Sequence, residues 1–262
     1  MQFLPEIRTI TLIGSGNVAW HLGRGFHLKG LRIHEICSRS ESSARELAGK
    51  VGAGVVTDPG KLSPGSDLYI IAVSDSGIAE VARELKLENK LVVHTSGSVP
   101  LSEISASSSL SGVFYPLQTF SKHIPVNLAE VPFCLEASAP EALDRLKELA
   151  LLISPVVLHT SSEERLLMHL AAVFASNYAN LMYTLASEIL ATKGLSFDLL
   201  KPLVAETARK VITGEPHRVQ TGPARRGDRN VIGKHLELLA SMPEYAEIYR
   251  LLAGKINPDL FK

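Results

Sequence analysis

A short glycine-rich segment near the start of the chain carries the clearest chemical signal in the sequence. The apolar run Thr9–Ile13 leads into Gly14-Ser15-Gly16-Asn17-Val18-Ala19, a G-x-G-x-x-A pattern between a predicted strand and a predicted helix. Gly14 permits a tight turn, Gly16 removes the Cβ that would keep a pyrophosphate from the backbone, and Ala19 lets the helix approach the strand. Because the first N–H groups of a helix are unpaired, they can bind the phosphates. The segment therefore predicts a dinucleotide-binding turn.

The end of the second predicted strand indicates which dinucleotide this turn accepts. Ser38, Arg39 and Ser40 stand where an NAD-preferring site usually has an Asp or Glu that binds the ribose 2′-hydroxyl. Glu35 comes too early, inside the strand. Two hydroxyls and a guanidinium suit a 2′-phosphate dianion. The sequence therefore predicts NADP(H) as the cofactor, and the alternative is a solvated arginine beside a helix cap.

Small polar residues follow the next two predicted strands as well. In an open parallel sheet, ligands bind outside the carboxyl ends of the strands, where hydroxyls can bond a ribose or a nicotinamide amide. For Ser74, which follows the strand over residues 68–73, capping of the next helix is an equally good explanation. The residues we expect at this edge are Val73 and Ser74 after one strand, and His94, Thr95, Ser96 and Gly97 after the other.

Strands and helices alternate through the first part of the chain. Strands are predicted over residues 8–14, 31–38, 68–73, 91–94, 112–114, 133–136 and 156–159, and helices over 17–29, 41–50, 77–87 and 140–153. A polar loop is predicted over residues 105–111. Such alternation predicts a parallel sheet with right-handed crossovers, which gives an α/β fold with a doubly wound Rossmann domain over residues 1–158.

After residue 160 the strand signal ends and only helical spacing remains. Helices are predicted over residues 162–191, 197–213, 231–240 and 244–253, with Asp228 or Asn230 as the cap of the third. Residues 159–262 are therefore predicted to form an all-helical domain. Residues 166–187 contain no charged side chain, but His169, Ser176 and Asn177 interrupt them, which favours a buried helix over a membrane span.

Composition limits the partners that the chain is expected to have. Lys and Arg together number 27, and so do Asp and Glu, so the bulk charge gives no reason to expect a nucleic-acid partner. The first residues, Met1–Glu6, lack a cationic stretch leading into an apolar run, so no signal peptide is expected. Two cysteines and nine scattered histidines show no ligand spacing, which predicts no metal site and a reducing, cytoplasmic setting.

Several later motifs, together with the segments above, make the chain resemble a known family. The carriers are Gly14–Ala19, Ser38–Ser40, His94–Ser98, Tyr115-Pro-Leu-Gln-Thr-Phe120, His169–Asn177 and Gln220–Asp228. The chain resembles the Rossmann-like NADP oxidoreductases of unassigned substrate, distant relatives of pyrroline-5-carboxylate reductase, ketopantoate reductase and the hydroxyacid dehydrogenases. The resemblance implies a helical C-terminal domain that often dimerises and a substrate cleft between the two domains. It implies no particular substrate.

The sequence departs from these relatives at the position of their catalytic lysine. The hydroxyacid and ketopantoate relatives use Lys and Asn four residues apart on the first long helix, whereas this chain has no lysine between Lys147 and Lys193. We expect His169 to be the proton donor or orienting group and Asn177 to be a polar anchor, about 12 Å apart along an ideal helix. The alternative is that both side chains are satisfied by hydrogen bonds between helices.

Two further segments supply candidate contacts with a substrate. Pro116 forces an extended entry into Leu117–Phe120, so that Gln118 and Thr119 can face a cleft, and Tyr115 is a further candidate. Arg226 in the loop before the third helix could hold a carboxylate in a bidentate pair, although a solvated loop or a dimer contact would also explain it.

The sequence as a whole predicts an NADP-dependent reductase or dehydrogenase of a small polar metabolite, such as a keto acid or cyclic imine. We expect a homodimer formed through the helical domain. Two alternatives remain at this stage: a non-catalytic NADP(H)-binding sensor or scaffold, and a deazaflavin-linked reduction of NADP.

Overall fold

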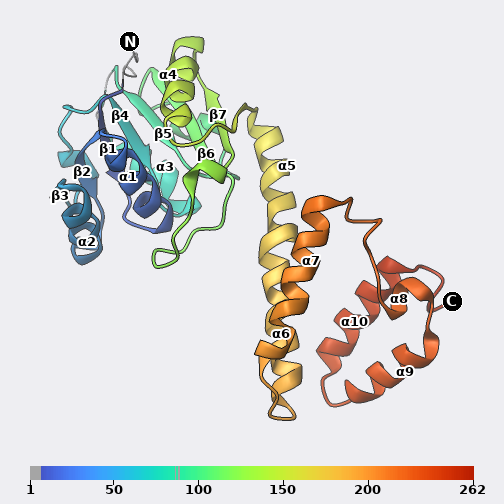
Figure 1. Cartoon of the computed structure of the whole chain (residues 1–262). Coiled ribbons are helices and arrows are strands. Elements are labelled where there is room, and N and C mark those ends of the chain that lie inside the picture. The colour runs from blue at the N-terminus through green and yellow to red at the C-terminus, as the bar shows by residue number, and fades with distance from the viewer. Residues whose placement is uncertain (1–6, 86, 88) are drawn as a thin grey trace. The chain divides into compact units, whose positions relative to one another are not determined.

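A computed structural model describes residues 7–85, 87 and 89–262 of the chain. The expectation about a signal peptide concerns Met1–Glu6 and so lies outside the described residues. Packing divides the chain into two compact units, one ending at Asn177 and the other beginning at Tyr178 (Figure 1).

The first unit is built on an eight-stranded sheet with the order β3-β2-β1-β4-β5-β6-β7-β8. The first six strands in this order are parallel and give the Rossmann arrangement, with the change of direction in strand order between β1 and β4. The strands are β1 (Thr9–Ile13), β2 (Arg32–Cys37), β3 (Gly54–Val56), β4 (Leu68–Ile71), β5 (Leu91–His94), β6 (Leu110–Pro116), β7 (Phe133–Ala137) and β8 (Val157–His159).

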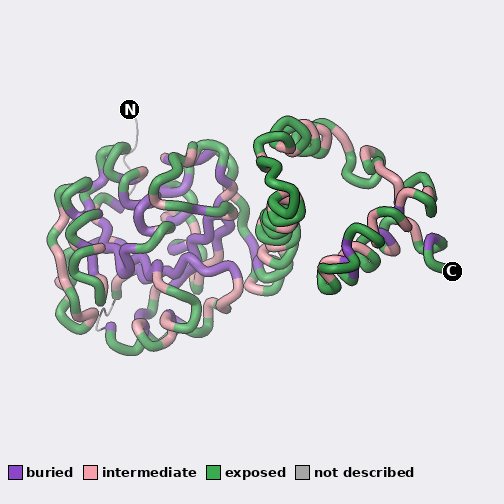
Figure 2. The backbone as a smooth tube through the Cα atoms, turned by 90° about the horizontal axis from the view of Figure 1, so that it is seen from below, coloured by how far each residue is buried: buried purple, intermediate pink, exposed green. Residues whose placement is uncertain are grey.

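Helices cover both faces of this sheet. Alternate residues of a strand point to opposite faces, so each face needs its own cover of apolar side chains. Leu68 and Ile70 pack in the cluster formed by α1 (Asn17–Leu28), α2 (Glu41–Val51) and α4 (Pro140–Leu151). Tyr69 and Ile71 pack on the other side with α3 (Asp75–Glu84). Because both faces are covered, all four residues of β4 are buried, as in other parallel sheets. Figure 2 shows the buried residues, in purple, concentrated in the interior of the first unit.

The predicted parallel, doubly wound sheet is confirmed with one exception, because β7 runs antiparallel to β6. A parallel connection needs a long crossover, usually a helix, whereas residues 117–132 contain only the 3-10 turn Leu128–Glu130. Parallel pairing resumes between β7 and β8, which α4 connects. The predicted polar loop over residues 105–111 also ends early, because β6 already begins at Leu110. The three-residue β3 was not predicted, since so short a strand shows no alternation.

The predicted helix over residues 162–191 has three parts. α5 (Ser162–Ala172) is followed by a π-helical turn, Val173–Tyr178, and then by α6 (Ala179–Ala191). A π turn accommodates an extra residue, so it rotates the residues after it relative to an ideal α-helix. The placement of Asn177 relative to His169 that an ideal helix predicts therefore does not apply.

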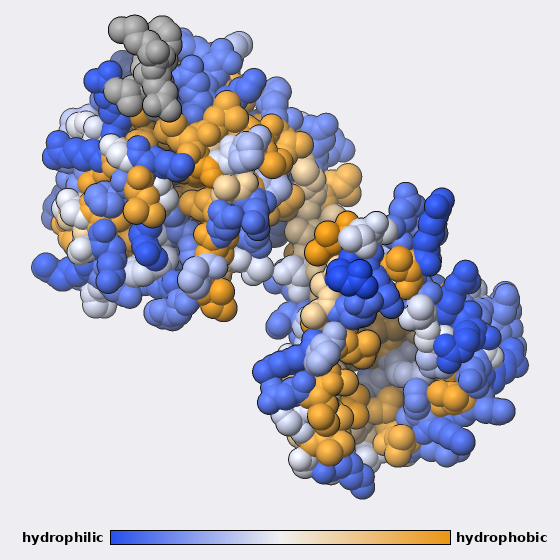
Figure 3. Space-filling model, in the orientation of Figure 1, coloured by the Kyte–Doolittle hydropathy of each residue, from blue (hydrophilic) through white to orange (hydrophobic). Residues whose placement is uncertain are grey.

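Helices alone form the second unit. After α6 come α7 (Lys201–Thr213), the short α8 (Pro223–Arg226), α9 (Arg229–Leu238) and α10 (Pro243–Ile256). Asp228 caps α9, because its carboxylate accepts a hydrogen bond from the Val231 N–H at 3.1 Å. A small core forms around Ile232, and Figure 3 shows hydrophobic residues, in orange, on the surface of this unit.

The change from sheet to helices occurs where the sequence predicts it, between β8 and α5. The two compact units divide later, after Asn177, so a domain boundary at residues 158/159 stays a prediction. In the part of the chain that the structure describes, no helix has both the length and the apolar character needed to cross a bilayer.

A buried ion pair fastens the start of α5 to the sheet. The fully buried guanidinium of Arg165 pairs with the carboxylate of Glu136 on β7. It also donates hydrogen bonds to the Val99 carbonyl at 2.6 Å and the Ser162 hydroxyl at 3.2 Å. The Ser162 hydroxyl in turn donates to the Glu136 carboxylate. These contacts join three separate segments of the first unit, so we expect them to be important for its stability.

We predict that Arg165→Met lowers the free energy of unfolding of the first unit by about 3–5 kcal/mol, because it leaves the Glu136 carboxylate without its buried partner. Urea unfolding followed by the fluorescence of Trp20, the only tryptophan, measures this. Arg45→Met is the control, since Arg45 pairs with Glu41 in the open, and its loss should cost less than about 1 kcal/mol. Equal effects of the two substitutions would contradict the role given to Arg165.

Candidate functional site

The turn after β1 is confined between two neighbouring strands. Gly14 has a φ of +120°, and a Cβ at this position would lie 2.1 Å from the carbonyl oxygen of Ala72, at the end of β4. The Gly14 N–H donates a hydrogen bond to the carbonyl of Cys37 at 2.7 Å, at the end of β2. Only glycine satisfies both the backbone angle and the close approach. The turn is therefore fixed at the point where the strand order reverses.

Open space lies in front of the first turn of α1. A Cβ at Gly16 would have no other atom within 4 Å, no side chain caps the helix, and its first turn contains no acidic residue. The N–H groups of such a helix start attract anions, and the helix dipole adds to the attraction. This arrangement fits the pyrophosphate of a dinucleotide.

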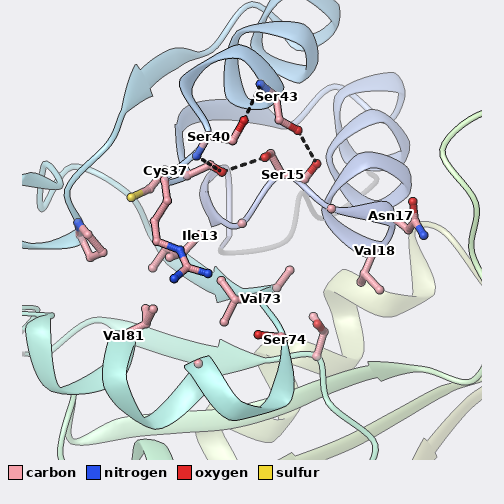
Figure 4. A pocket seen from close by; sticks show the side chains of 18 of the residues that line it. Ile13, Ser15, Asn17, Val18, Cys37, Ser40, Ser43, Val73, Ser74 and Val81 are labelled. Carbon is pink, nitrogen blue, oxygen red and sulfur yellow. Dashed lines mark hydrogen bonds between the residues drawn. The ribbon is translucent and has the colours of Figure 1, made fainter.

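A cavity of about 790 Å³ extends from this turn along the edge of the sheet (Figure 4). Its volume is in the range of ordinary cofactor pockets. Eleven of the residues expected to contact the cofactor line it: Gly14, Ser15, Gly16, Asn17, Val18, Ser38, Arg39, Ser40, Val73, Ser74 and Thr95. Ser74 stands at the N-cap position of α3 but makes no capping hydrogen bond, which leaves its hydroxyl available to a ligand.

Hydroxyl groups organise the tip of β2 on one side of this cavity. The Ser15 hydroxyl donates to the Ser38 hydroxyl at 2.9 Å, and the Ser40 N–H donates to the same oxygen at 3.3 Å (Figure 4). Ser40 caps α2 as predicted, by accepting from the Ser43 N–H at 3.4 Å. The carboxylate of Glu35 is bound elsewhere, because it accepts from the Ser63 N–H at 3.0 Å. The tip therefore presents hydroxyls and the exposed Arg39, while Glu80 and Glu84 line the cavity from α3.

His94 does not occupy the position expected from the sequence. Its ring is fully buried and does not line the cavity, and its Nδ1 accepts from the Ser96 N–H at 3.1 Å. Burial, and then the positive charge of Arg165, lower the pKa of His94 to about 4, so the ring is neutral near pH 7. The ring therefore shapes the turn after β5 from inside, while Thr95 from the same turn lines the cavity.

Gly97 makes room for a pair of side chains that the sequence does not connect. A Cβ on Gly97 would lie 2.8 Å from the ring of His169 and 2.8 Å from Cζ of Tyr115. The Tyr115 hydroxyl lies 3.1 Å from Nδ1 of His169, and the two rings meet edge to face. The pair therefore lies beside a turn whose Thr95, two residues earlier, lines the cavity.

The environment of Tyr115 determines how this hydrogen bond is oriented. Burial, followed by the nearby Cys134 and Asp75, raises the pKa of Tyr115 to about 12, so the phenol keeps its proton. A buried hydroxyl requires an acceptor, and Nδ1 of His169 is the acceptor that the described structure gives it. With Nδ1 accepting this hydrogen bond, Nε2 is the nitrogen of the His169 ring that is left to donate one.

The remaining predicted site residues lie on other elements. Asn177 is exposed on the π-helical turn. Gln118 and Thr119 are exposed after β6, and the Gln118 side chain accepts from the Thr119 N–H at 2.8 Å. Arg226 is exposed on α8, in the second unit. Ser96 and Gly97 lie outside the cavity lining.

Sequence spacing gave no sign of three charged residues in the cavity wall, namely Glu80, Glu84 and Lys122. Lys122 lines the cavity, and its ammonium donates to the Ser43 hydroxyl at 3.1 Å and the Glu46 carboxylate at 3.0 Å. It follows the motif Tyr115–Phe120 by two residues, but nothing in the spacing connects this loop with α2.

Comparisons with known proteins agree with this geometry. Residues 9–97 match a family model described as NADP oxidoreductase coenzyme F420-dependent, and residues 131–256 match a domain of unknown function, DUF2520. Among curated proteins no sequence matches the chain.

The solved structures include one close relative and more distant ones. A candidate NADP oxidoreductase from Bacteroides fragilis is 45% identical, with 97% of this chain and 99% of that chain covered and a TM-score of 0.92. An imine reductase from Myxococcus stipitatus, solved with NADP+, is 18% identical, with 96% and 92% covered and a TM-score of 0.60. A pyrroline-5-carboxylate reductase from Coxiella burnetii is 19% identical, with 96% and 97% covered and a TM-score of 0.55.

The two distant structures share the fold, whereas the B. fragilis relative matches in both sequence and fold over nearly the whole chain. The family resemblance stated from the sequence is thereby confirmed. The chain belongs to the family of NADP oxidoreductases that combine an N-terminal Rossmann domain with the C-terminal domain DUF2520, and it is an oxidoreductase of unassigned substrate.

Proposed function

We propose that this protein is an NADP(H)-dependent reductase or dehydrogenase of a small polar metabolite with a carbonyl or imine group. The observation that carries the proposal is the position of the Tyr115–His169 pair. It packs on Gly97, two residues from Thr95 at the cavity wall, and so supplies a hydrogen-bond donor beside the turn that lines the cavity. Hydride transfer needs such a donor beside the cofactor site.

The preference for NADP(H) over NAD(H) rests on the tip of β2. Ser38 and Ser40 form a hydroxyl-lined turn, and Arg39 adds a guanidinium that can pair with a 2′-phosphate. The acid nearest in sequence, Glu35, is held by the Ser63 N–H and so is not placed to accept from a ribose hydroxyl. When bound, NADPH supplies a hydride to the acceptor carbon.

In this proposal His169 acts on the heteroatom of the substrate. Its Nε2–H donates a hydrogen bond to the carbonyl oxygen or imine nitrogen, orients it, and stabilises the negative charge that develops there. Tyr115 holds the ring and fixes the tautomer through Nδ1. Asn177 as a polar anchor, and Gln118, Thr119 and Arg226 as substrate contacts, remain proposals that sequence motifs alone support.

The assembly and location of the protein form a further part of the proposal. We propose a homodimer formed through the helical domain, because large apolar side chains are exposed on its helices, among them Leu181, Leu199, Leu203 and Ile212, the last being 81% exposed (Figure 3). A cytoplasmic location is supported by Cys37 and Cys134, which are both unpaired and buried.

The central prediction concerns turnover. Following NADPH absorbance across a panel of keto acids and cyclic imines should identify at least one acceptor that the protein reduces. His169→Ala should then lower the rate of NADPH oxidation by about 10²–10⁴ and leave the affinity for NADPH unchanged. Tyr115→Phe should lower the rate less, because it keeps the His169 ring and removes only the hydrogen bond that fixes its tautomer. Tight NADPH binding without any acceptor would instead indicate a non-catalytic sensor. Unfolding of His169→Ala would assign the ring a structural role.

Cofactor selectivity provides a second test. We expect Arg39→Ala to weaken the binding of NADPH by about tenfold or more while changing that of NADH little, because only NADPH carries the charge that the guanidinium pairs with. Titration calorimetry with both dinucleotides measures this difference. Losses of equal size for the two would refute a contact between Arg39 and the 2′-phosphate.

The dimer can be tested by sedimentation. The wild-type protein should sediment with twice the mass of the 28.3 kDa chain. Leu203→Glu should shift it to the monomer, because a charge cannot be buried unpaired in an apolar interface. Leu28→Glu, at an even more exposed leucine of the first unit, is the control and should leave the dimer intact. A wild-type monomer at micromolar concentration would contradict the proposal.

A further inference from the structure

The loop after β6 is attached to α1 at several points, and this fixes the position of Lys122. Nε2 of His21 donates to the Ser121 carbonyl at 3.0 Å, and the His21 ring stacks at 5.1 Å from the ring of Phe120. The Lys122 N–H donates to the side-chain oxygen of Asn17 at 3.2 Å. Asn17 is the first residue of α1 and itself lines the cavity. A loop lysine is therefore held at the start of the phosphate-binding helix.

The side chain of Lys122 is ordered as well. It is only 17% exposed, and its ammonium lies 5.1 Å from the centre of the Trp20 ring while it binds Ser43 and Glu46. Fixing so long a side chain costs conformational entropy, which a solvated surface lysine avoids. The structure thus holds a positive charge in the cavity wall at a cost in side-chain entropy. Binding of a negatively charged ligand would offset this entropy cost.

Hydrogen bonds connect this ammonium with the tip of β2. Ser43, which accepts from Lys122, donates through its own hydroxyl to the Ser15 carbonyl at 3.4 Å and through its N–H to the Ser40 hydroxyl. Ser15 donates to Ser38 in turn. Lys122 is therefore linked through one residue to the turn that carries Arg39.

We propose that Lys122 is a second phosphate ligand, which together with Arg39 binds the 2′-phosphate of NADP(H). This inference rests on the proposed function of the cavity and assigns it a residue that determines selectivity. On binding, the ammonium exchanges the carboxylate of Glu46 for the phosphate, which carries more negative charge. Before binding, Glu46 and Ser43 hold the lysine at the cavity wall, so Glu46 is a competitor of the ligand.

The test compares the affinities for NADPH and NADH by titration calorimetry. Lys122→Gln, which keeps an apolar stem over Trp20, should weaken NADPH binding by roughly tenfold and NADH binding by less than about twofold. Lys122→Arg should retain most of the preference. The matched control is Lys50→Gln, an exposed lysine on α2 that does not line the cavity, and it should change neither affinity.

Glu46→Gln supplies an independent arm. Removing the competing carboxylate should tighten NADPH binding by about two- to fivefold, and this gain should vanish when Lys122→Gln is also present, because the two residues act through one contact. Equal losses for NADPH and NADH in Lys122→Gln, or no loss at all, would overturn the inference. If the wild-type protein binds neither dinucleotide, the proposed function itself fails. If it binds NADPH and Lys122→Gln binds NADPH equally well, only the role given to Lys122 fails.

Discussion

The close approach between the turn after β1 and the end of β4 is the constraint on which the site depends. Because a Cβ at Gly14 would lie 2.1 Å from the Ala72 carbonyl oxygen, the two strand ends can meet only at a glycine. That contact places the start of α1 at the reversal of strand order, with open space before Gly16. The hydroxyl-lined tip of β2 and Thr95 after β5 then become neighbouring parts of one cavity. A side chain at residue 14 would separate these parts before any ligand arrived.

Much of the fold could be predicted because local patterns and global packing agree. The strands of the sheet centre are continuous apolar runs, and Ser40 and Asp228 cap their helices as their positions indicate. The direction of β7 was mispredicted, because strand periodicity is the same in either direction and the only sign of the reversal is that no helix is predicted between residues 114 and 133. The π-helical turn Val173–Tyr178 was missed because its residues have ordinary helical spacing.

The candidate site was predictable to the extent that its residues are close in sequence. The glycine turn and the tip of β2 are local, and they line the cavity together. Tyr115 and His169 meet across 54 positions, and Lys122 meets Glu46 across 76, so neither pair leaves a trace in spacing. His94 was expected to contact the cofactor because it stands at the end of a strand. Its ring is buried, and the sequence alone does not show this. Burial and long-range contact are properties of the packed chain.

The reversal of β7 has a consequence for the edge of the sheet that holds the cavity. Since Pro116 pairs with Phe133, the chain leaves β6 and enters β7 at the same edge, the one where parallel strands present their carboxyl ends. A helical crossover would have carried the intervening residues along a face of the sheet to the opposite edge. The antiparallel strand instead leaves residues 117–132 at the edge of the sheet that holds the cavity, where Lys122 lines the cavity wall. Because Phe120 and Val131 pack in the core on either side of Lys122, the same segment both closes the core and supplies a positive charge to the cavity.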